Sequence, residues 1–348
     1  MSIKIKSNNK NYFVYFFEDL NFLNELDFKN SLFIIDSNVW AIYKNYFQNL
    51  IQEKFCFIID AKEDNKTLAM AQKIYNKAIE LEFKKNMKII SIGGGIVQDV
   101  SGFVASTLFR GITWYYIPTT LLAQSDSCIG SKTSINYNDY KNLIGTFFSP
   151  NKIFISLEFI NSLNNIDFFS GLGEIVKLHI LGGKKYIKKL NNSFDLILKK
   201  DKKTIMEAIK NSLYIKKRFI EKDEFDMGIR NYLNYGHCFG HALESATEFK
   251  IPHGQAVTLG MLLANNFSKI NNDYINNLIN RTLIFNIKNI EFKIDDVINF
   301  MKKDKKRMTN DLPLVLCDKN LKFKKINNFK TSDAVKILED YLNELRRN

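Results

Sequence analysis

Cysteine is scarce in this sequence, and its few occurrences are scattered. Cys56, Cys128, Cys238 and Cys317 form no CxxC pair and no spacing typical of a disulfide framework. We therefore expect reduced thiols in a cytoplasmic protein and no cysteine among metal ligands. Long apolar runs are absent as well: none reaches the roughly 20 residues that a membrane span needs, and no apolar secretion signal follows the N-terminus. The sequence thus predicts a soluble protein without a membrane partner.

The sequence also lacks a basic stripe with interleaved aromatic residues, although its formal net charge is +13. The lysines are spread along the chain, which argues against a nucleic-acid partner. A positive field still favours the approach of an anion. The charge pattern therefore favours an anionic small molecule as the partner.

Length and pattern indicate two domains. At 348 residues the chain exceeds the roughly 250–300 residues at which one hydrophobic core stops growing. Short apolar, β-branched or aromatic runs predict strands. Between some of them, apolar residues recur at the spacing of a helix, and such alternation of strands and helices is typical of a parallel α/β sheet. We expect strands at 32–35, 54–59, 87–92, 114–117 and 152–155, and helices at 66–83 and 96–108.

The pattern changes near residues 155–170, beyond which long helical patterns dominate and few convincing strands occur. We therefore expect an α/β domain over residues 1–160 and a mostly α-helical domain over residues 161–348. The helices are expected at 168–181, 202–219, 233–248 and 254–267.

Histidine is rare, yet three of the four histidines lie between positions 237 and 253. His237 and His241 are four residues apart, on one face of a helix, and His253 begins the next helix. Imidazoles placed in this way can converge on one divalent ion, although capped or surface histidines are the alternative. A carboxylate would complete a catalytic site, and Glu174 is the best candidate because two preceding glycines allow close backbone approach. We thus predict a metalloenzyme.

A run of three glycines, Gly93 to Gly95, separates a predicted strand from a helix. Backbone N–H groups at such a helix N-terminus can bind a pyrophosphate. The run is not the GxGxxG fingerprint, so a tight turn without a ligand is the alternative. Asp36 ends another predicted strand, where its carboxylate can bind ribose hydroxyls or form an Asx turn.

Basic residues gather in two later segments. Gly-Ser-Lys-Thr at 130–133 resembles the end of a P-loop, but the required earlier glycine and preceding strand are missing, which argues against NTP hydrolysis. Farther on, Lys216 and Arg230 precede the histidines, and cations beside a metal are costly unless an anion binds there. Together with Lys132, Lys141 and Arg110, they predict an anionic substrate.

These motifs together resemble the 3-dehydroquinate synthase family, over about residues 31–316. The matching segments follow that family's order and approximate spacing. They are GGGIVQDVSGFVASTLFRG, IPTTLLAQSDSCIGSKTSIN, KNLIGTFFSP, GEIVK, DEFDMGIRNYLNYGHCFGHALE and HGQAV.

The resemblance implies a nucleotide-binding α/β domain with a parallel sheet, followed by a mostly α-helical metal-binding domain, in a homodimer that uses NAD and zinc or cobalt. It implies Glu174, His237 and His253 as metal ligands, with His241 contacting the substrate instead. The implied NAD contacts are Asp36, Asn38, Glu63, Lys66, Gly94, Gly95, Ile96, Asp99, Thr119, Thr120, Asp126, Lys132 and Lys141.

The implied activity is a phosphate-eliminating lyase of the shikimate pathway. It converts 3-deoxy-D-arabino-heptulosonate 7-phosphate to 3-dehydroquinate through transient oxidation by NAD, phosphate elimination, reduction and intramolecular aldol closure. The implied substrate contacts are Lys132, Asn142, Asn234 and His241 to the phosphate, Arg110 from a second subunit, Lys141, and Lys216 with Arg230 to the carboxylate. Catalytic roles are implied for Lys132, Asp126, Glu224, His241 and Lys177.

Three departures from the family pattern leave alternatives open. Gln98 stands where the family has glycine, Ser131 and Ser134 replace glycines, and Pro313 replaces a basic residue. A paralogous cyclase acting on sedoheptulose 7-phosphate is one alternative, although it should not need both cations of the carboxylate site. A metal-dependent NAD alcohol or glycerol dehydrogenase, which needs no phosphate and carboxylate pocket, is another. A cyclase-like protein that binds NAD or a partner without turnover is the third.

Overall fold

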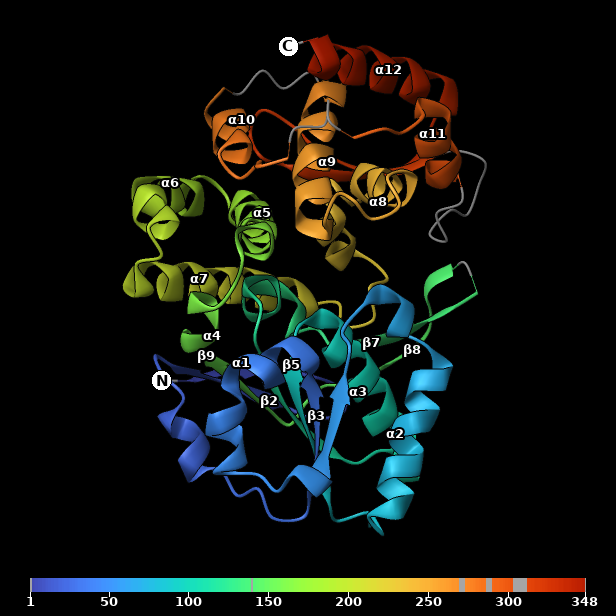
Figure 1. Cartoon of the computed structure of the whole chain (residues 1–348). Coiled ribbons are helices and arrows are strands. Elements are labelled where there is room, and N and C mark those ends of the chain that lie inside the picture. Colours follow the sequence, from blue (N-terminus) through green and yellow to red (C-terminus); the bar gives the residue numbers. More distant parts are fainter. Residues whose placement is uncertain (1, 139, 269–272, 286–289, 303–311, 348) are drawn as a thin grey trace. The chain divides into compact units, whose positions relative to one another are not determined.

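The computed structural model describes residues 2–347 except 139, 269–272, 286–289 and 303–311. The chain divides into two compact units, Met1–Leu163 and Asn164–Asn348. A sheet with helices forms the first unit, and helices dominate the second (Figure 1). The predicted fold class, a parallel α/β domain followed by a mostly helical domain, is confirmed.

A sheet lies at the centre of the first unit (Figure 1). It has seven strands in the order β1-β2-β9-β6-β5-β3-β4. Every neighbouring pair from β2 to β4 is parallel, and β1 adds an antiparallel edge. Parallel strands covered on both faces need nearly continuous apolar runs, which is why β3, β4, β5, β6 and β9 were predictable. The strands are β1 (Ser2–Ile5), β2 (Tyr12–Phe17), β3 (Ser31–Asp36), β4 (Cys56–Ile59), β5 (Lys88–Gly93), β6 (Thr113–Pro118) and β9 (Lys152–Ser156).

Helices α2 and α3 occupy the two predicted helical segments of this unit, and α3 packs on β3, β5 and β6. The helix that follows β3 was not expected, because its aromatic and asparagine residues have modest helix propensity. The helices are α1 (Ser37–Gln48), α2 (Leu68–Glu80), α3 (Gly95–Thr107) and α4 (Glu158–Asn161). Short 3₁₀ turns occupy Asn21–Glu25, Glu53–Phe55, Glu63–Asn65 and Leu108–Arg110, and a π-helical turn occupies Ala123–Ser127.

An antiparallel hairpin that the sequence did not predict joins β7 (Lys132–Tyr137) to β8 (Tyr140–Phe147). Most residues of β8 are exposed or half-buried, so no apolar run marks it. The hairpin packs against α3 through β7. It carries several predicted site residues to the side of that helix.

Helix α5 (Asn165–Gly182) is the centre of the second unit and packs against α6, α7, α9 and α10. Two glycines set its distance from α9: a Cβ on Gly173 would come within 2.5 Å of the Gly254 carbonyl oxygen, and one on Gly254 within 1.9 Å of the Ser170 carbonyl oxygen. The other helices are α6 (Lys184–Leu198), α7 (Lys202–Ile220), α8 (His237–Ala246), α9 (His253–Phe267), α10 (Asp273–Asn280), α11 (Ile294–Lys302) and α12 (Thr331–Arg347). Of the helices in the described residues, none combines the length and apolar character that crossing a membrane requires.

The helix predicted over 233–248 exists as α8 but begins later than expected. A 3₁₀ helix, η6 (Ile229–Asn234), ends before α8 begins, and Gly236 between them has a φ of +79°. A Cβ there would lie 2.8 Å from the Val257 carbonyl oxygen, so only glycine fits both the backbone and the space. The sequence also missed the antiparallel pair β10 (Leu312–Cys317) and β11 (Phe323–Phe329).

His179, on α5, makes a testable contribution to stability. Burial lowers the pKa of His179 to about 4, although the nearby Ile175 carbonyl oxygen opposes the shift. Between pH 6.5 and about 4 the unfolded chain therefore holds a proton on this residue that the folded chain does not. We expect the free energy of unfolding to fall as the pH falls through that window, and to fall less steeply in His179→Asn. Urea unfolding at several pH values measures this free energy for both proteins. If it falls with pH equally steeply in the two, the expectation is contradicted.

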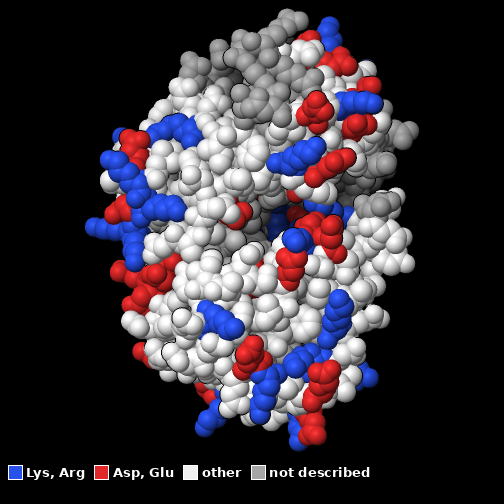
Figure 2. Space-filling view, in the orientation of Figure 1, with Lys and Arg blue, Asp and Glu red and all other residues white. Residues whose placement is uncertain are grey.

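The basic excess is dispersed where the surface can be seen. On the face that Figure 2 shows, Lys and Arg side chains alternate with Asp and Glu side chains over the coloured, described residues. Alternating charges give a weaker local field than a stripe of one sign. This face therefore offers no reason to revise the expected anionic small-molecule partner.

Candidate functional site

Three histidines converge in the second unit. His237 begins α8, His241 follows one turn later, and His253 begins α9. One ring nitrogen from each lies within 4.8 Å of the others. The four-residue spacing and the packing of α8 on α9 produce this cluster, as the sequence predicted.

Glu174 lies beside this cluster. Its carboxylate, 1% exposed, places Oε1 3.8 Å from His237 Nε2 and 3.5 Å from His253 Nε2. The close α5–α9 contact at Gly173 and Gly254 brings the carboxylate this near. Two imidazole nitrogens and a carboxylate oxygen suit a divalent transition-metal ion and leave a coordination position for another ligand. The donor set therefore fits the implied metal.

In His237 and His253, the ring nitrogen that points away from Glu174 is Nδ1, and it lies near a different acceptor in each. His237 Nδ1 lies 3.2 Å from the Tyr235 carbonyl oxygen, and His253 Nδ1 lies 3.2 Å from Glu244 Oε2. If both Nδ1 atoms carry the hydrogen, both Nε2 atoms are free to act as ligands. The sequence analysis did not predict a role for Glu244. In the sequence, Glu244 differs from other glutamates only in sharing a helical face with His237 and His241.

The pKa values of His253 and His237 are shifted in opposite directions. Burial alone would lower the pKa of His253, but hydrogen bonds to Glu174 and Glu244 raise it to about 10. Burial, Lys177 and the other two histidines hold the pKa of His237 well below its ordinary value. The surroundings thus favour a proton on His253 and disfavour one on His237.

Lys177 completes the charged group on α5. It lies one turn after Glu174, is 2% exposed, and forms a close ion pair with Glu174 Oε2. An isolated buried ammonium would be costly, and the Glu174 carboxylate compensates that cost. The predicted ligand Glu174 and the predicted catalytic Lys177 are therefore coupled.

A turn organised by Asp223 carries the predicted carboxylate-binding residues. Asp223 accepts backbone N–H bonds from Met227, Gly228 and Arg230 at 2.9, 2.7 and 3.0 Å. Burial would raise the pKa of Asp223, but these three donors outweigh it and the net pKa is lowered. The sequence did not single out Asp223.

Arg230 and Lys216 are both buried, at 4% and 8% exposure. An Nη1 hydrogen of Arg230 bonds to the Glu224 carbonyl oxygen, and η6, which carries Arg230 and Asn234, packs on α7, which carries Lys216. Two buried cations on neighbouring elements form a suitable environment for an anionic group.

In the first unit the ends of three neighbouring strands carry the predicted nucleotide contacts. Ile35 pairs with Ile92 and Gly93 pairs with Pro118 in the parallel sheet. The carboxyl ends of β3, β5 and β6 therefore share one edge, which is where ligands bind in such sheets. The residues brought to this edge are Asp36, Asn38, Gly94, Gly95, Ile96, Thr119 and Thr120.

The backbone of the glycine turn is open at Gly95. Gly94 precedes α3, whose first residue is Gly95, and a Cβ on Gly95 would meet only the Ser127 hydroxyl, at 3.9 Å. The N-terminus of α3 thus presents open backbone N–H groups. Asp36 Oδ1 accepts the Asn38 backbone N–H at 2.8 Å, so the Asx turn is present, and the ribose contact stays a prediction.

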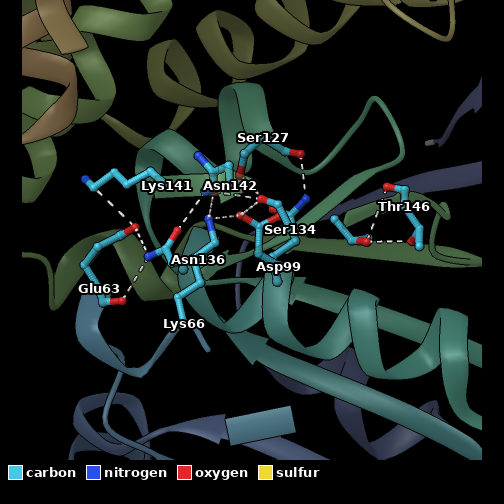
Figure 3. A network of polar contacts seen from close by, with 12 residues as sticks. Glu63, Lys66, Asp99, Ser127, Ser134, Asn136, Lys141, Asn142 and Thr146 are labelled. Atoms are coloured by element: carbon cyan, nitrogen blue, oxygen red, sulfur yellow. Dashed lines mark hydrogen bonds and ion pairs between the residues drawn. The ribbon is translucent and has the colours of Figure 1, made fainter. Parts of the chain in front are cut away.

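A polar network links the hairpin to α3 and the loop before α2 (Figure 3). Lys66 Nζ lies 2.5 Å from both Asp99 Oδ2 and Asn142 Oδ1. Ser134 Oγ lies 2.8 Å from Asn142 Oδ1 and 3.3 Å from Asp99 Oδ2. Burial raises the pKa of Asp99, and the Lys66 ammonium opposes that shift. The network brings together residues that the sequence assigned separately to NAD and substrate.

The same network continues to Glu63 (Figure 3). Its Oε1 accepts from Asn136 Nδ2 at 2.9 Å and lies 3.9 Å from Lys141 Nζ. The Asn142 backbone N–H in turn donates to Asn136 Oδ1 at 2.8 Å. Asn136, which the sequence did not single out, therefore connects Glu63 with Asn142.

Two of the departures from the family pattern, Gln98 and Ser134, have local hydrogen-bond partners. Gln98 Nε2 donates to the Ser127 carbonyl oxygen and Gln98 Oε1 accepts from the Ser127 hydroxyl, both at 2.7 Å. Ser134 belongs to the network around Lys66. Ser131 has a φ of +65°, a conformation that glycine adopts with less strain. The side chain of Pro313, on β10, lies outside the described residues.

Three further predicted residues belong to the first unit. Asp126 is in the π-helical turn and Lys132 begins β7. Arg110 is exposed and, like Phe109 before it, has a positive φ, at +60° and +50°. Backbone strain of this kind is often retained for function, and the contact of Arg110 with a second subunit stays a prediction.

Comparison with known proteins agrees with this arrangement. Residues 56–170 match the profile described as 3-dehydroquinate synthase N-terminal, and residues 171–307 match the one described as 3-dehydroquinate synthase C-terminal. The 3-dehydroquinate synthase of Pelagibacter ubique is 39% identical over 313 residues, which cover 84% of this chain and 83% of the relative. That of Dictyoglomus thermophilum is 33% identical over 347 residues and 97% of both chains.

Solved structures show the same fold. ValA, a 2-epi-5-epi-valiolone synthase of Streptomyces hygroscopicus with NAD+ and Zn2+ bound, has a TM-score of 0.83 at 18% identity over 98% of both chains. A 2-deoxy-scyllo-inosose synthase with carbaglucose-6-phosphate, NAD+ and Co2+ has a TM-score of 0.80 at 23% identity, covering 97% of this chain and 100% of the other. The glycerol dehydrogenase of Schizosaccharomyces pombe has a lower TM-score of 0.63 at 16% identity, covering 96% of this chain and 90% of the other.

Proposed function

Because this chain belongs to the 3-dehydroquinate synthase family, we propose that it converts 3-deoxy-D-arabino-heptulosonate 7-phosphate to 3-dehydroquinate and inorganic phosphate. The observation that carries the choice of substrate is the pair of buried cations, Lys216 and Arg230, in the unit that holds the histidine cluster. Two buried cations suit a substrate that carries a carboxylate, which sedoheptulose 7-phosphate lacks.

Glu174, His237 and His253 are the proposed ligands of a zinc or cobalt ion, and His241 is the proposed substrate contact beside it. The glycine turn before α3 and the polar side chains around it are the proposed NAD site. When bound, NAD supplies a hydride acceptor and donor and the metal supplies Lewis acidity, and together they permit phosphate elimination and ring closure without net redox change.

The chain's own residues bind, orient and exchange protons with the substrate. Lys216 and Arg230 are assigned to its carboxylate, and the groups that hold its phosphate are Lys132, Asn142, Asn234 and His241, helped by Lys141 and by Arg110 of a second subunit in a homodimer. Such fixed donors and cations provide positioning and charge stabilisation. The residues assigned to catalysis are Asp126, Lys132, Lys177, Glu224 and His241.

Release of inorganic phosphate tests the proposal. We expect turnover of the heptulosonate phosphate when NAD and zinc are both present, loss of turnover after chelation, and recovery when the metal is restored. Sedoheptulose 7-phosphate, which lacks the carboxylate, is the matched control and should release little phosphate. Turnover of sedoheptulose 7-phosphate alone would replace the proposed function with that of a paralogous cyclase.

A further inference from the structure

The two imidazoles that face Glu174 differ in the acceptor that lies beside Nδ1. His237 Nδ1 is 3.2 Å from a neutral carbonyl oxygen, that of Tyr235. His253 Nδ1 is 3.2 Å from a carboxylate oxygen, that of Glu244. A hydrogen bond to an ionised acceptor is about twice as strong as one to a neutral acceptor. The cluster is thus asymmetric although both rings are histidines.

We propose that Glu244 is a positioning residue for the metal. Its carboxylate accepts the Nδ1 hydrogen of His253, keeps Nε2 directed at Glu174 and the metal, and strengthens Nε2 as an electron donor through its negative charge. The inference rests on the proposed metal site and adds a role for a residue outside the ligand set.

The backbone fixes Glu244 at this place. Glu244 lies on α8 seven residues after His237 and three after His241, so all three share one helical face. Helices α8 and α9 approach closely at two glycines: a Cβ on Gly260 would lie 2.0 Å from the Gly236 carbonyl oxygen, and one on Gly240 would lie 3.0 Å from Val257 Cα. The distance between Glu244 and His253 is therefore set by helix packing rather than by a flexible loop.

The partial burial of Glu244 strengthens the electrostatic effect of its carboxylate on His253. The carboxylate is 13% exposed and the His253 ring 34% exposed, so solvent screens their interaction only partly. Acceptors placed in this way fix the tautomer and orientation of a metal-bound histidine, and their loss lowers metal affinity by roughly 10–100-fold. The carboxylate is also the only one of the two supporting acceptors that a side-chain substitution can remove.

The competing interpretation is that Glu244 only ties α8 to α9. The two interpretations differ in what Glu244→Gln does, since glutamine keeps a carbonyl oxygen at the same distance and loses the charge. A purely structural role predicts unchanged metal binding in this variant. Our proposal predicts weaker binding with the fold intact.

Metal binding without substrate or NAD tests the proposal. Zinc affinity is measured in the full chain by competition with a chromophoric chelator, and cobalt binding by its visible absorption spectrum. We expect about 10-fold weaker zinc binding and an altered cobalt spectrum in Glu244→Gln, and a loss towards about 100-fold in Glu244→Ala. The control Glu248→Gln removes the same charge from an exposed position two residues beyond α8 and should bind like the wild type.

The outcomes separate this inference from the proposed metal site. Unchanged zinc affinity and an unchanged cobalt spectrum in Glu244→Gln overturn the role of Glu244, and so does an equal loss in Glu248→Gln. Failure of the metal site itself shows differently, as no zinc binding by the wild type or as undiminished binding by His253→Ala. If Glu244→Ala does not fold, the glutamine variant alone decides between the two interpretations.

Discussion

Glu174→Gln is expected to lower the free energy of unfolding of the metal-free protein by about 3–5 kcal/mol, the usual scale for breaking a buried ion pair. The reason is Lys177, which is 2% exposed and loses the carboxylate that compensates its charge. Urea unfolding in the presence of a chelator, followed by far-ultraviolet circular dichroism, measures the change. Zinc binding should fall as well, because the variant also loses a ligand.

The matched control is the double variant Glu174→Gln/Lys177→Met. Removing the unpaired ammonium should recover most of the lost stability, since replacing a whole buried pair by uncharged side chains is often neutral. Zinc binding should not recover, because the ligand is still missing. A single variant as stable as the wild type would contradict the ion pair, and a double variant that regains zinc would contradict Glu174 as a ligand.

The features that were predictable from the sequence are those fixed by local pattern. The parallel strands needed continuous apolar runs, and the rarity of histidine made the spacing of His237, His241 and His253 conspicuous. The three glycines after β5 predicted the strand-to-helix turn that the structure contains. Each of these features could be predicted from residues that lie close together in the sequence.

The features that were not predictable depend on contacts between distant segments. Lys66 and Asn142 lie 76 residues apart in sequence and meet only because the hairpin packs beside α3. The position of Glu244 is set by the packing of α8 on α9. The helical pattern is interrupted at Gly236, which has a left-handed backbone and where α9 leaves no space for a Cβ. Helical periodicity continued through residues 233–248, so the break was visible only in the packing.

Arg230→Ala is expected to weaken carboxylate-dependent binding by about 2–4 kcal/mol, the scale for truncating one partner of a buried charge pair. Arg230 is 4% exposed and its backbone N–H donates to Asp223, so the guanidinium is held in a position largely shielded from water. We expect kcat/KM for the heptulosonate phosphate to fall by roughly 30–700-fold, which is that free energy at about 1.4 kcal/mol per tenfold.

Arg218→Ala is the matched control, because it removes the same charge from an exposed position on α7 and should change kcat/KM little. The comparison separates a specific contact from the general attraction of a basic protein for an anionic substrate, which both variants reduce equally. An unchanged kcat/KM in Arg230→Ala would contradict the carboxylate assignment. A large fall in Arg230→Ala together with a small one in Arg218→Ala would instead support the sugar acid as substrate, because only the sugar acid carries the carboxylate.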